Sequence, residues 1–244
     1  SFVVGIVVGG LATISGAILI LYAQTLSKTV PDAVGHMISA SLIVLPASIL
    51  IARLMVPGDG DTQMEPDDTS LKYESSIDAV ITGTMDGVQL FLAVIGIIIV
   101  VFALVALVDQ ILGVLPLIDG SPLTLRRFFG WIFAPLMWAI GIPWEDAGTA
   151  GGLMGTKAIL NEYVAYLDMA ALSDGELGPR SKLIITYALC GFANLASVGL
   201  LVSTIGTLCP ARRTDAASLG MKSWVAGNLA SAMTGAMIGL VTVV

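Results

Sequence analysis

The sequence predicts an all-α, polytopic membrane fold with inverted repeats, unwound transmembrane helices and a re-entrant hairpin. Three observations predict it: an apolar composition, several long apolar runs, and two similar glycine-rich segments that carry polar side chains. Hydrophobic residues make up 56% of the 244 residues and charged residues only 12%, whereas an ordinary soluble domain has about 25% charged residues. The composition therefore excludes an ordinary soluble domain.

The apolar runs set the order of the elements, because a helix that crosses the hydrocarbon core needs about 20 apolar residues. The runs that qualify are 2–26, 33–56, 86–113, 182–208 and 215–244. From these runs and the polar breaks between them we expect the following parts: a broken transmembrane helix with the helix after it, forming an incomplete first repeat (1–56), an acidic connector loop (57–84), a transmembrane helix and loop (85–123), an interfacial helix (124–142), a re-entrant hairpin (143–172), and a second broken transmembrane helix with the last helix, forming the second repeat (182–244).

The net charge of −7 is concentrated in one loop of the sequence. The acidic residues there are Asp59, Asp61, Glu65, Asp67, Asp68 and Glu74, against the single base Lys72. Asp59 and Asp61 begin like a calcium-binding loop of the EF-hand type, but the required glycine at the sixth position and glutamate at the twelfth are missing. We therefore interpret the segment as a solvated connector.

Two glycine-rich segments resemble each other and predict two broken helices. Residues 9–19 read GGLATISGAIL and residues 190–201 read CGFANLASVGLL, so that a glycine, an apolar residue, an alanine and a polar residue recur in the same order. Unwound backbone is tolerated in a membrane only where it lines a cavity or meets a ligand, and inverted repeats with broken helices are typical of secondary transporters. Small residues also allow close helix packing, but Asn194 and Ser197 beside the glycines favour a binding site.

The segment 143–172 predicts a hairpin whose tip carries a buried charge. Pro143 and the acids after it are typical of a helix start, and the distance to the next polar loop allows one helix in and one helix out, with Asn161 and Glu162 at the turn. A carboxylate at membrane depth costs about 2.5–3.5 kcal/mol or more unless a partner or ligand meets it. The alternative is an ion pair between Lys157 and Glu162 that only holds the hairpin together, although their five-residue spacing is poor for one helix face.

Residues typical of catalysis or metal binding are scarce. Near Glu162 the sequence offers no second carboxylate, no Ser–His pair and no zinc triad, so we expect no enzymatic activity and no cofactor. Cys190 and Cys209 have neither metal-site nor disulfide spacing, and we expect both to be buried small hydrophobic residues. The lone His36 is interpreted as structural.

Two stretches identify a family resemblance. GTKAILNEYVAY (155–166) and ALCGFANLASVG (188–199) resemble the signature stretches of the concentrative nucleoside transporter family, and GGLATISGAILILYA (9–23) is similar to that family's unwound fourth transmembrane helix. The resemblance covers essentially the whole chain but only the carboxy-terminal portion of the family. The chain opens inside an apolar run, without a methionine or a signal peptide, and we expect an upstream part that carries the family's first hairpin.

The resemblance implies a homotrimeric, multi-pass symporter of the cell inner (plasma) membrane that takes up nucleosides of the uridine, cytidine and adenosine class with Na⁺ or H⁺. The implied substrate site consists of Glu162, Asn161, Asn194, Ser197, Phe192 and Ile18, with Glu162 accepting hydrogen bonds from the ribose. The Thr13 side chain and the Ile14 carbonyl match positions of a partial Na⁺ site, although serine is common where Thr13 stands. A passive channel for nucleosides or small solutes is the alternative function.

Overall fold

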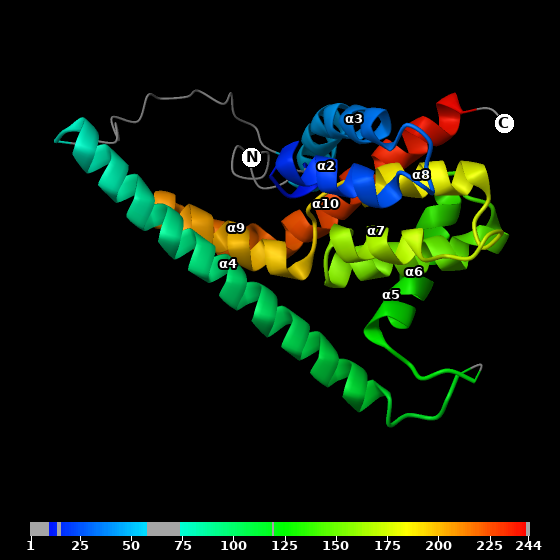
Figure 1. Cartoon of the computed structure of the whole chain (residues 1–244). Helices are drawn as coiled ribbons and strands as arrows, with labels where there is room; N and C mark the ends of the chain where they lie inside the picture. The colour runs from blue at the N-terminus through cyan, green and yellow to red at the C-terminus, as the bar shows by residue number, and fades with distance from the viewer. Residues whose placement is uncertain (1–9, 14–15, 58–73, 119, 243–244) are drawn as a thin grey trace.

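The computed structural model describes residues 10–13, 16–57, 74–118 and 120–242, and within these residues the chain is helical without a β-strand. The predicted all-α fold is confirmed. The helices, shown in Figure 1, are α2 (Gly16–Leu26), α3 (Ala33–Met55), α4 (Ser76–Leu112), α5 (Leu125–Ala139), α6 (Trp144–Ile159), α7 (Glu162–Ala170), α8 (Pro179–Leu189), α9 (Leu195–Leu208), the short 3₁₀ helix η1 (Pro210–Arg212) and α10 (Arg213–Val241).

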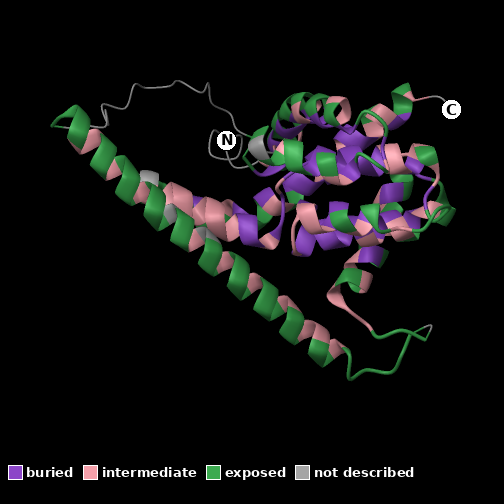
Figure 2. Cartoon of the chain, in the orientation of Figure 1, coloured by how far each residue is buried: buried purple, intermediate pink, exposed green. Residues whose placement is uncertain are grey.

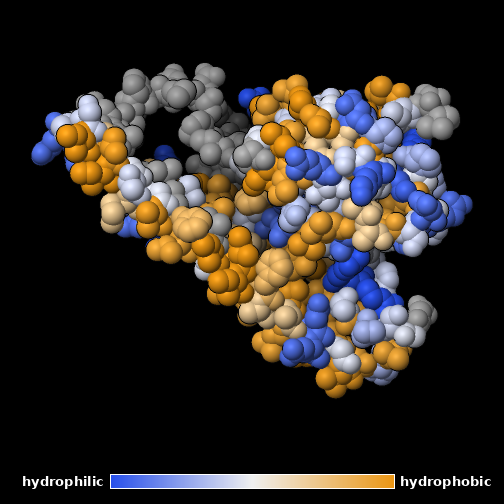
Figure 3. Space-filling view, in the orientation of Figure 1, coloured by the Kyte–Doolittle hydropathy of each residue, from blue (hydrophilic) through white to orange (hydrophobic). Residues whose placement is uncertain are grey.

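Within the part of the chain that the structure describes, three helical stretches are long and apolar enough to cross a membrane: Ala33–Met55, Ser76–Leu112 and Pro210–Val241. Helix α4 has 37 residues and is therefore about 55 Å long, well above the roughly 30 Å of a hydrocarbon core. It lies diagonally along one side of the molecule and is largely exposed (Figure 2), and hydrophobic residues cover most of its visible surface (Figure 3). An exposed apolar helix of this length suits contact with lipid.

Helix α4 begins at Ser76, so the prediction that the connector loop extends to residue 84 is wrong for its last part. The helix starts early because the Ser75 hydroxyl accepts a hydrogen bond from the Asp78 amide at 3.1 Å, which is a helix N-cap. Asp78 also places a negative charge in the first turn, where the helix dipole favours it. Most of the acidic loop, residues 58–73, lies outside the described residues.

Both glycine-rich segments contain a helix break. Helix α8 ends at Leu189 and α9 begins at Leu195, and a short helical stretch at 10–12 precedes α2. The two breaks lie against each other, since a Cβ atom on Gly191 would lie 2.9 Å from the carbonyl oxygen of Ala12. Only glycine permits this approach. Each broken segment is followed by one long helix, α3 after α2 and α10 after α9, and these two long helices also pack against each other.

Helices α6 and α7 form the predicted hairpin, with the turn at Leu160 and Asn161. Helix α5 packs closely along α6, because a Cβ atom on Gly151 would lie 2.5 Å from the Gly130 carbonyl oxygen. The outer end of the hairpin is tied together by Asp168, which forms a salt bridge of 3.0 Å with Arg126 of α5. Helix α5 thus contacts both helices of the hairpin.

The predictions for the histidine and the two cysteines have different outcomes. The His36 Nδ1 atom lies 3.0 Å from the Tyr187 hydroxyl, which fits a structural histidine. Cys190 is buried as predicted, whereas the prediction that Cys209 is buried is wrong. Cys209 caps the end of α9 just before the exposed 3₁₀ turn, where no helix covers it.

Candidate functional site

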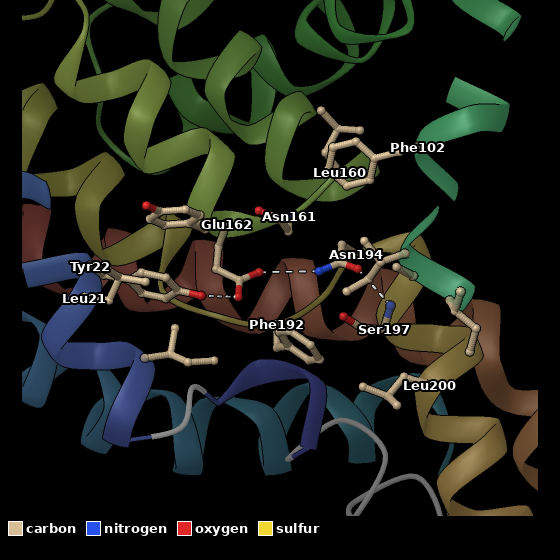
Figure 4. A pocket seen from close by; sticks show the side chains of 15 residues that line it. Leu21, Tyr22, Phe102, Leu160, Asn161, Glu162, Phe192, Asn194, Ser197 and Leu200 are labelled. Carbon is tan, nitrogen blue, oxygen red and sulfur yellow. Dashed lines mark hydrogen bonds between the residues drawn. The ribbon is translucent and has the colours of Figure 1, made fainter. Parts of the chain in front are cut away.

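A cavity of about 220 Å³ lies where α2, the hairpin turn and the break between α8 and α9 come together. Its walls come from α2, from the middle of α4, from the hairpin turn, and from the start of α9 with the break before it (Figure 4). All six predicted substrate residues line it: Ile18, Asn161, Glu162, Phe192, Asn194 and Ser197. Thr13 is described but does not line this cavity, and Ile14 lies outside the described residues.

Two asparagines start the two helices that point at the cavity. The Asn161 Oδ1 atom accepts a hydrogen bond from the Val164 amide at 2.8 Å, and the Asn194 Oδ1 atom accepts one from the Ser197 amide at 2.8 Å. Both are N-caps. Because each amide oxygen is bonded to backbone, the amide nitrogen of each residue is the donor left over for other partners. The positive ends of the α7 and α9 dipoles therefore meet at the cavity.

Glu162 is 2% exposed and is the first residue of α7. Its Oε1 atom accepts a hydrogen bond from the Tyr22 hydroxyl at 2.6 Å, and its Oε2 atom accepts one from the Asn194 amide nitrogen at 3.4 Å (Figure 4). An ionised carboxylate has about four acceptor positions, so these two bonds leave capacity for a ligand. The helix dipoles and neutral donors stabilise the negative charge.

Ser197 supplies a second polar group with unused capacity. Its side chain is 1% exposed, and its hydroxyl is without a hydrogen-bond partner among the described residues. A buried hydroxyl that lacks a partner destabilises a protein by about 1–3 kcal/mol, and such groups are rare unless a ligand or water meets them. A few convergent polar groups in an otherwise apolar cavity are characteristic of a small-molecule site.

Lys157 lies outside the cavity, and the alternative of a Lys157–Glu162 ion pair is wrong. The salt bridges among the described residues do not include Lys157. Its side chain is fully buried, and its ammonium group donates hydrogen bonds to the Ala188 carbonyl oxygen at 3.0 Å and to the Ser231 hydroxyl. Lys157 therefore donates to the end of α8, and the Glu162 carboxylate accepts hydrogen bonds from Tyr22 and Asn194 instead.

Three side chains each donate a hydrogen bond to one carbonyl oxygen at or near the break between α8 and α9. Tyr166 donates to the Thr186 oxygen at 3.0 Å, Lys157 to the Ala188 oxygen, and Asn228 to the Ala193 oxygen at 3.0 Å. The last carbonyls of a helix lack intrahelical partners, and in a membrane they must be satisfied within the protein. The break is thus supported by residues of the hairpin and of α10.

The structure adds residues to the cavity that the sequence did not predict. Two of them are tyrosines, Tyr22 and Tyr163. Tyr22 lies four residues after Ile18 and thus on the same face of α2. That spacing was the available signal. Ile97, Ile98 and Phe102 of α4 also line the cavity, but nothing in the apolar middle of this helix (90–108) distinguishes them from residues that face lipid.

Comparisons with known proteins point to one family. The family model described as "Na+ dependent nucleoside transporter C-terminus" matches residues 36–239. A Haemophilus influenzae protein described as an uncharacterized transporter is 39% identical over 243 residues, covering 96% of this chain and 57% of that protein. The Helicobacter pylori nucleoside permease NupC is 32% identical over 236 residues, covering 95% of this chain and 55% of the permease.

Solved structures of the transporter CNTnw are similar in fold. A variant in an outward-facing state has a TM-score of 0.84 at 37% identity, covering 99% of this chain and 58% of that one. An inward-facing substrate-bound state has a TM-score of 0.74 at 38% identity, covering 97% and 56%. The chain thus spans little more than half the length of the proteins that it matches.

Proposed function

The chain belongs to the family of Na⁺ dependent nucleoside transporter C-termini, and on that premise we propose that it is the carboxy-terminal portion of a secondary active nucleoside symporter. The transporter would take up nucleosides of the uridine, cytidine and adenosine class across the cell inner membrane. The resemblance in sequence further supports a multi-pass homotrimer.

One observation carries the proposal: a buried carboxylate, an amide nitrogen and an unpaired hydroxyl converge on one cavity. The sugar of a nucleoside offers vicinal hydroxyl groups that can donate to Glu162 and accept from Asn194. Hydrogen bonds to a charged group are the stronger kind, and the Ser197 hydroxyl gains a partner when the sugar binds. Phe192 and Ile18 supply apolar surface beside the polar groups, which suits a flat nucleobase.

Alternating access follows from where the cavity lies. It lies between α2 and the break before α9, which belong to the two segments of similar sequence, and one repeat can move against the other around such a site. CNTnw has been solved in outward-facing and inward-facing states, which supports the same cycle for this chain.

The coupling ion is Na⁺ or H⁺ in this proposal. Thr13 stands in the break that precedes α2, and with the Ile14 carbonyl it would supply hard oxygen ligands of the kind that Na⁺ prefers. The remaining ligands would come from the part of the transporter that precedes this chain. Ion and substrate that favour the same occupied state strengthen each other's binding reciprocally.

Uptake measurements test the proposal. The full-length protein in proteoliposomes should accumulate radiolabelled uridine above the external concentration when a Na⁺ or H⁺ gradient is imposed, and accumulation should cease when the gradient is collapsed. A passive channel would only equilibrate uridine, and an enzyme would change its chemical identity in chromatography of the vesicle contents. Equilibration without uphill accumulation under either gradient would refute symport.

A further inference from the structure

Tyr22 of α2 is buried and contacts the hairpin. Its side chain is 2% exposed, and its hydroxyl donates a hydrogen bond to Glu162 on a helix 140 residues further along the chain. The contact joins α2 to the first turn of the hairpin's second helix (Figure 4). Both residues also line the cavity.

The two oxygens of Glu162 are held unequally. The bond from Tyr22 is 2.6 Å long, which is within the range of a charge-assisted O–H···O⁻ bond. The bond from Asn194 is 3.4 Å long, near the upper limit for a hydrogen bond. A ligand hydroxyl can therefore replace or supplement the Asn194 contact at Oε2, whereas Oε1 is already strongly bonded.

The Tyr22 ring is fixed by its surroundings. It stacks on Tyr163 with a centroid distance of 5.9 Å and packs on Tyr166 at 5.1 Å. Tyr166 is itself fully buried and bonded to the Thr186 carbonyl. Such aromatic contacts favour one ring position, so the phenol hydroxyl reaches the carboxylate without further ordering of the side chain.

We infer that Tyr22 is a positioning residue that fixes Oε1 of Glu162 and leaves Oε2 as the preferred acceptor for the sugar. The inference rests on the proposed nucleoside transport and specifies how the sugar is read. The sugar hydroxyl that meets Oε2 then gains a bond to a charged acceptor, whereas the neighbouring hydroxyl meets the neutral groups of Asn194 and Ser197. The transporter then discriminates strongly against only one of the two deoxynucleosides, the 2′-deoxy or the 3′-deoxy form.

Uptake by the full-length protein tests this consequence with uridine, 2′-deoxyuridine and 3′-deoxyuridine. In the wild type, one deoxy form should be transported much less well than the other. In Tyr22→Phe, which keeps the ring and removes the hydroxyl, the preference for uridine over that deoxy form, measured as a ratio of kcat/KM, should fall at least about fivefold. The control Tyr187→Phe removes a hydroxyl outside the cavity that bonds to His36, and it should leave the ratio unchanged.

A merely structural tyrosine would lower uptake of all three compounds in proportion and leave the ratio as it was. That result, or equal discrimination against both deoxy forms by the wild type, would overturn the inference. A ratio that changes in Tyr22→Phe and not in Tyr187→Phe supports it.

Infrared spectroscopy of purified protein without nucleoside tests the contact itself. The wild-type spectrum minus that of Glu162→Gln isolates the carboxylate stretching band of Glu162, and the same difference in a Tyr22→Phe background should show that band shifted to higher frequency. A fluorotyrosine placed at position 22 keeps the fold and strengthens the donor, so its band should shift the other way. A band that does not shift would overturn the Tyr22–Glu162 contact. The spectroscopic test does not depend on transport, so a wild type that fails to accumulate uridine would refute the proposed function alone.

Discussion

The Lys157 ammonium group donates a hydrogen bond to the Ala188 carbonyl oxygen at 3.0 Å, which fastens the inner end of the hairpin's first helix to the last turn of α8. The same ammonium bonds to Ser231 of α10. A cation at the negative end of a helix is favourable, and this one also satisfies a carbonyl that the helix break would leave without a partner. The lysine in the signature stretch is thus explained by the break and not by the cavity.

We expect Lys157→Met to lower the thermal stability of the purified protein. Methionine fills a similar space but donates no hydrogen bond, and a buried oxygen that loses its donor costs about 1–3 kcal/mol. Melting temperatures in detergent check this. The matched variant Lys222→Met removes an exposed lysine of α10, and it should lie within about 0.5 kcal/mol of the wild type. Equal melting temperatures for the two variants would contradict the assigned role.

Gly191→Ala should damage both folding and transport. The added Cβ would lie 2.9 Å from the Ala12 carbonyl oxygen, which belongs to backbone and cannot turn aside, so the two helix breaks must move apart. Expression and size-exclusion profiles measure the effect on folding. Gly148→Ala is the control, since nothing lies within 4 Å of a Cβ on that exposed glycine of α6, and alanine there favours the helix by up to about 1 kcal/mol. Similar profiles for both variants would show that the breaks are not in close contact.

The part of the fold that the sequence could predict was the part in which polar residues interrupt apolar runs. Pro143 at a helix start, Asn161 and Glu162 at a turn, and Asn194 after a glycine all leave a local signal, and the structure has helix boundaries at each. The N-cap at Ser75 was missed, because an acidic and serine-rich segment is equally typical of a loop. Its capping depends on a single hydroxyl–amide bond.

Long-range pairing could not be predicted. An ion pair between Lys157 and Glu162 was an open alternative despite their poor spacing. In the structure the partners of Lys157 come from α8 and α10, and the strong donor to Glu162 comes from α2. These contacts depend on how five helices pack, and no local sequence pattern predicts that packing. The apolar wall that α4 adds to the cavity was missed for the same reason.

Glu162→Gln should reduce nucleoside uptake at least about tenfold without unfolding the protein. The amide keeps the shape of the carboxylate but loses the charge that strengthens its hydrogen bonds, and bonds to charged groups contribute about 1.5–3 kcal/mol. Uptake of radiolabelled uridine, normalised to the amount of protein in the membrane, checks the effect. Glu176→Gln changes an exposed carboxylate in the loop before α8 and should transport normally. Normal uptake by a well-expressed Glu162→Gln protein would remove Glu162 from the site.

Substitutions of Asn194 should separate its two roles, because its oxygen caps α9 and its nitrogen faces Glu162. Asn194→Ser keeps an oxygen for the Ser197 amide, because serine is also a good N-cap, but its shorter side chain loses the nitrogen that reaches Glu162. Its melting temperature should stay close to that of the wild type, while nucleoside affinity falls. Asn194→Ala loses both roles, so stability should drop by about 1 kcal/mol and binding should weaken by about 1–3 kcal/mol. Isothermal titration calorimetry and thermal melting of both variants measure the two effects, and unchanged affinity in Asn194→Ser would mean that the amide nitrogen takes no part in binding.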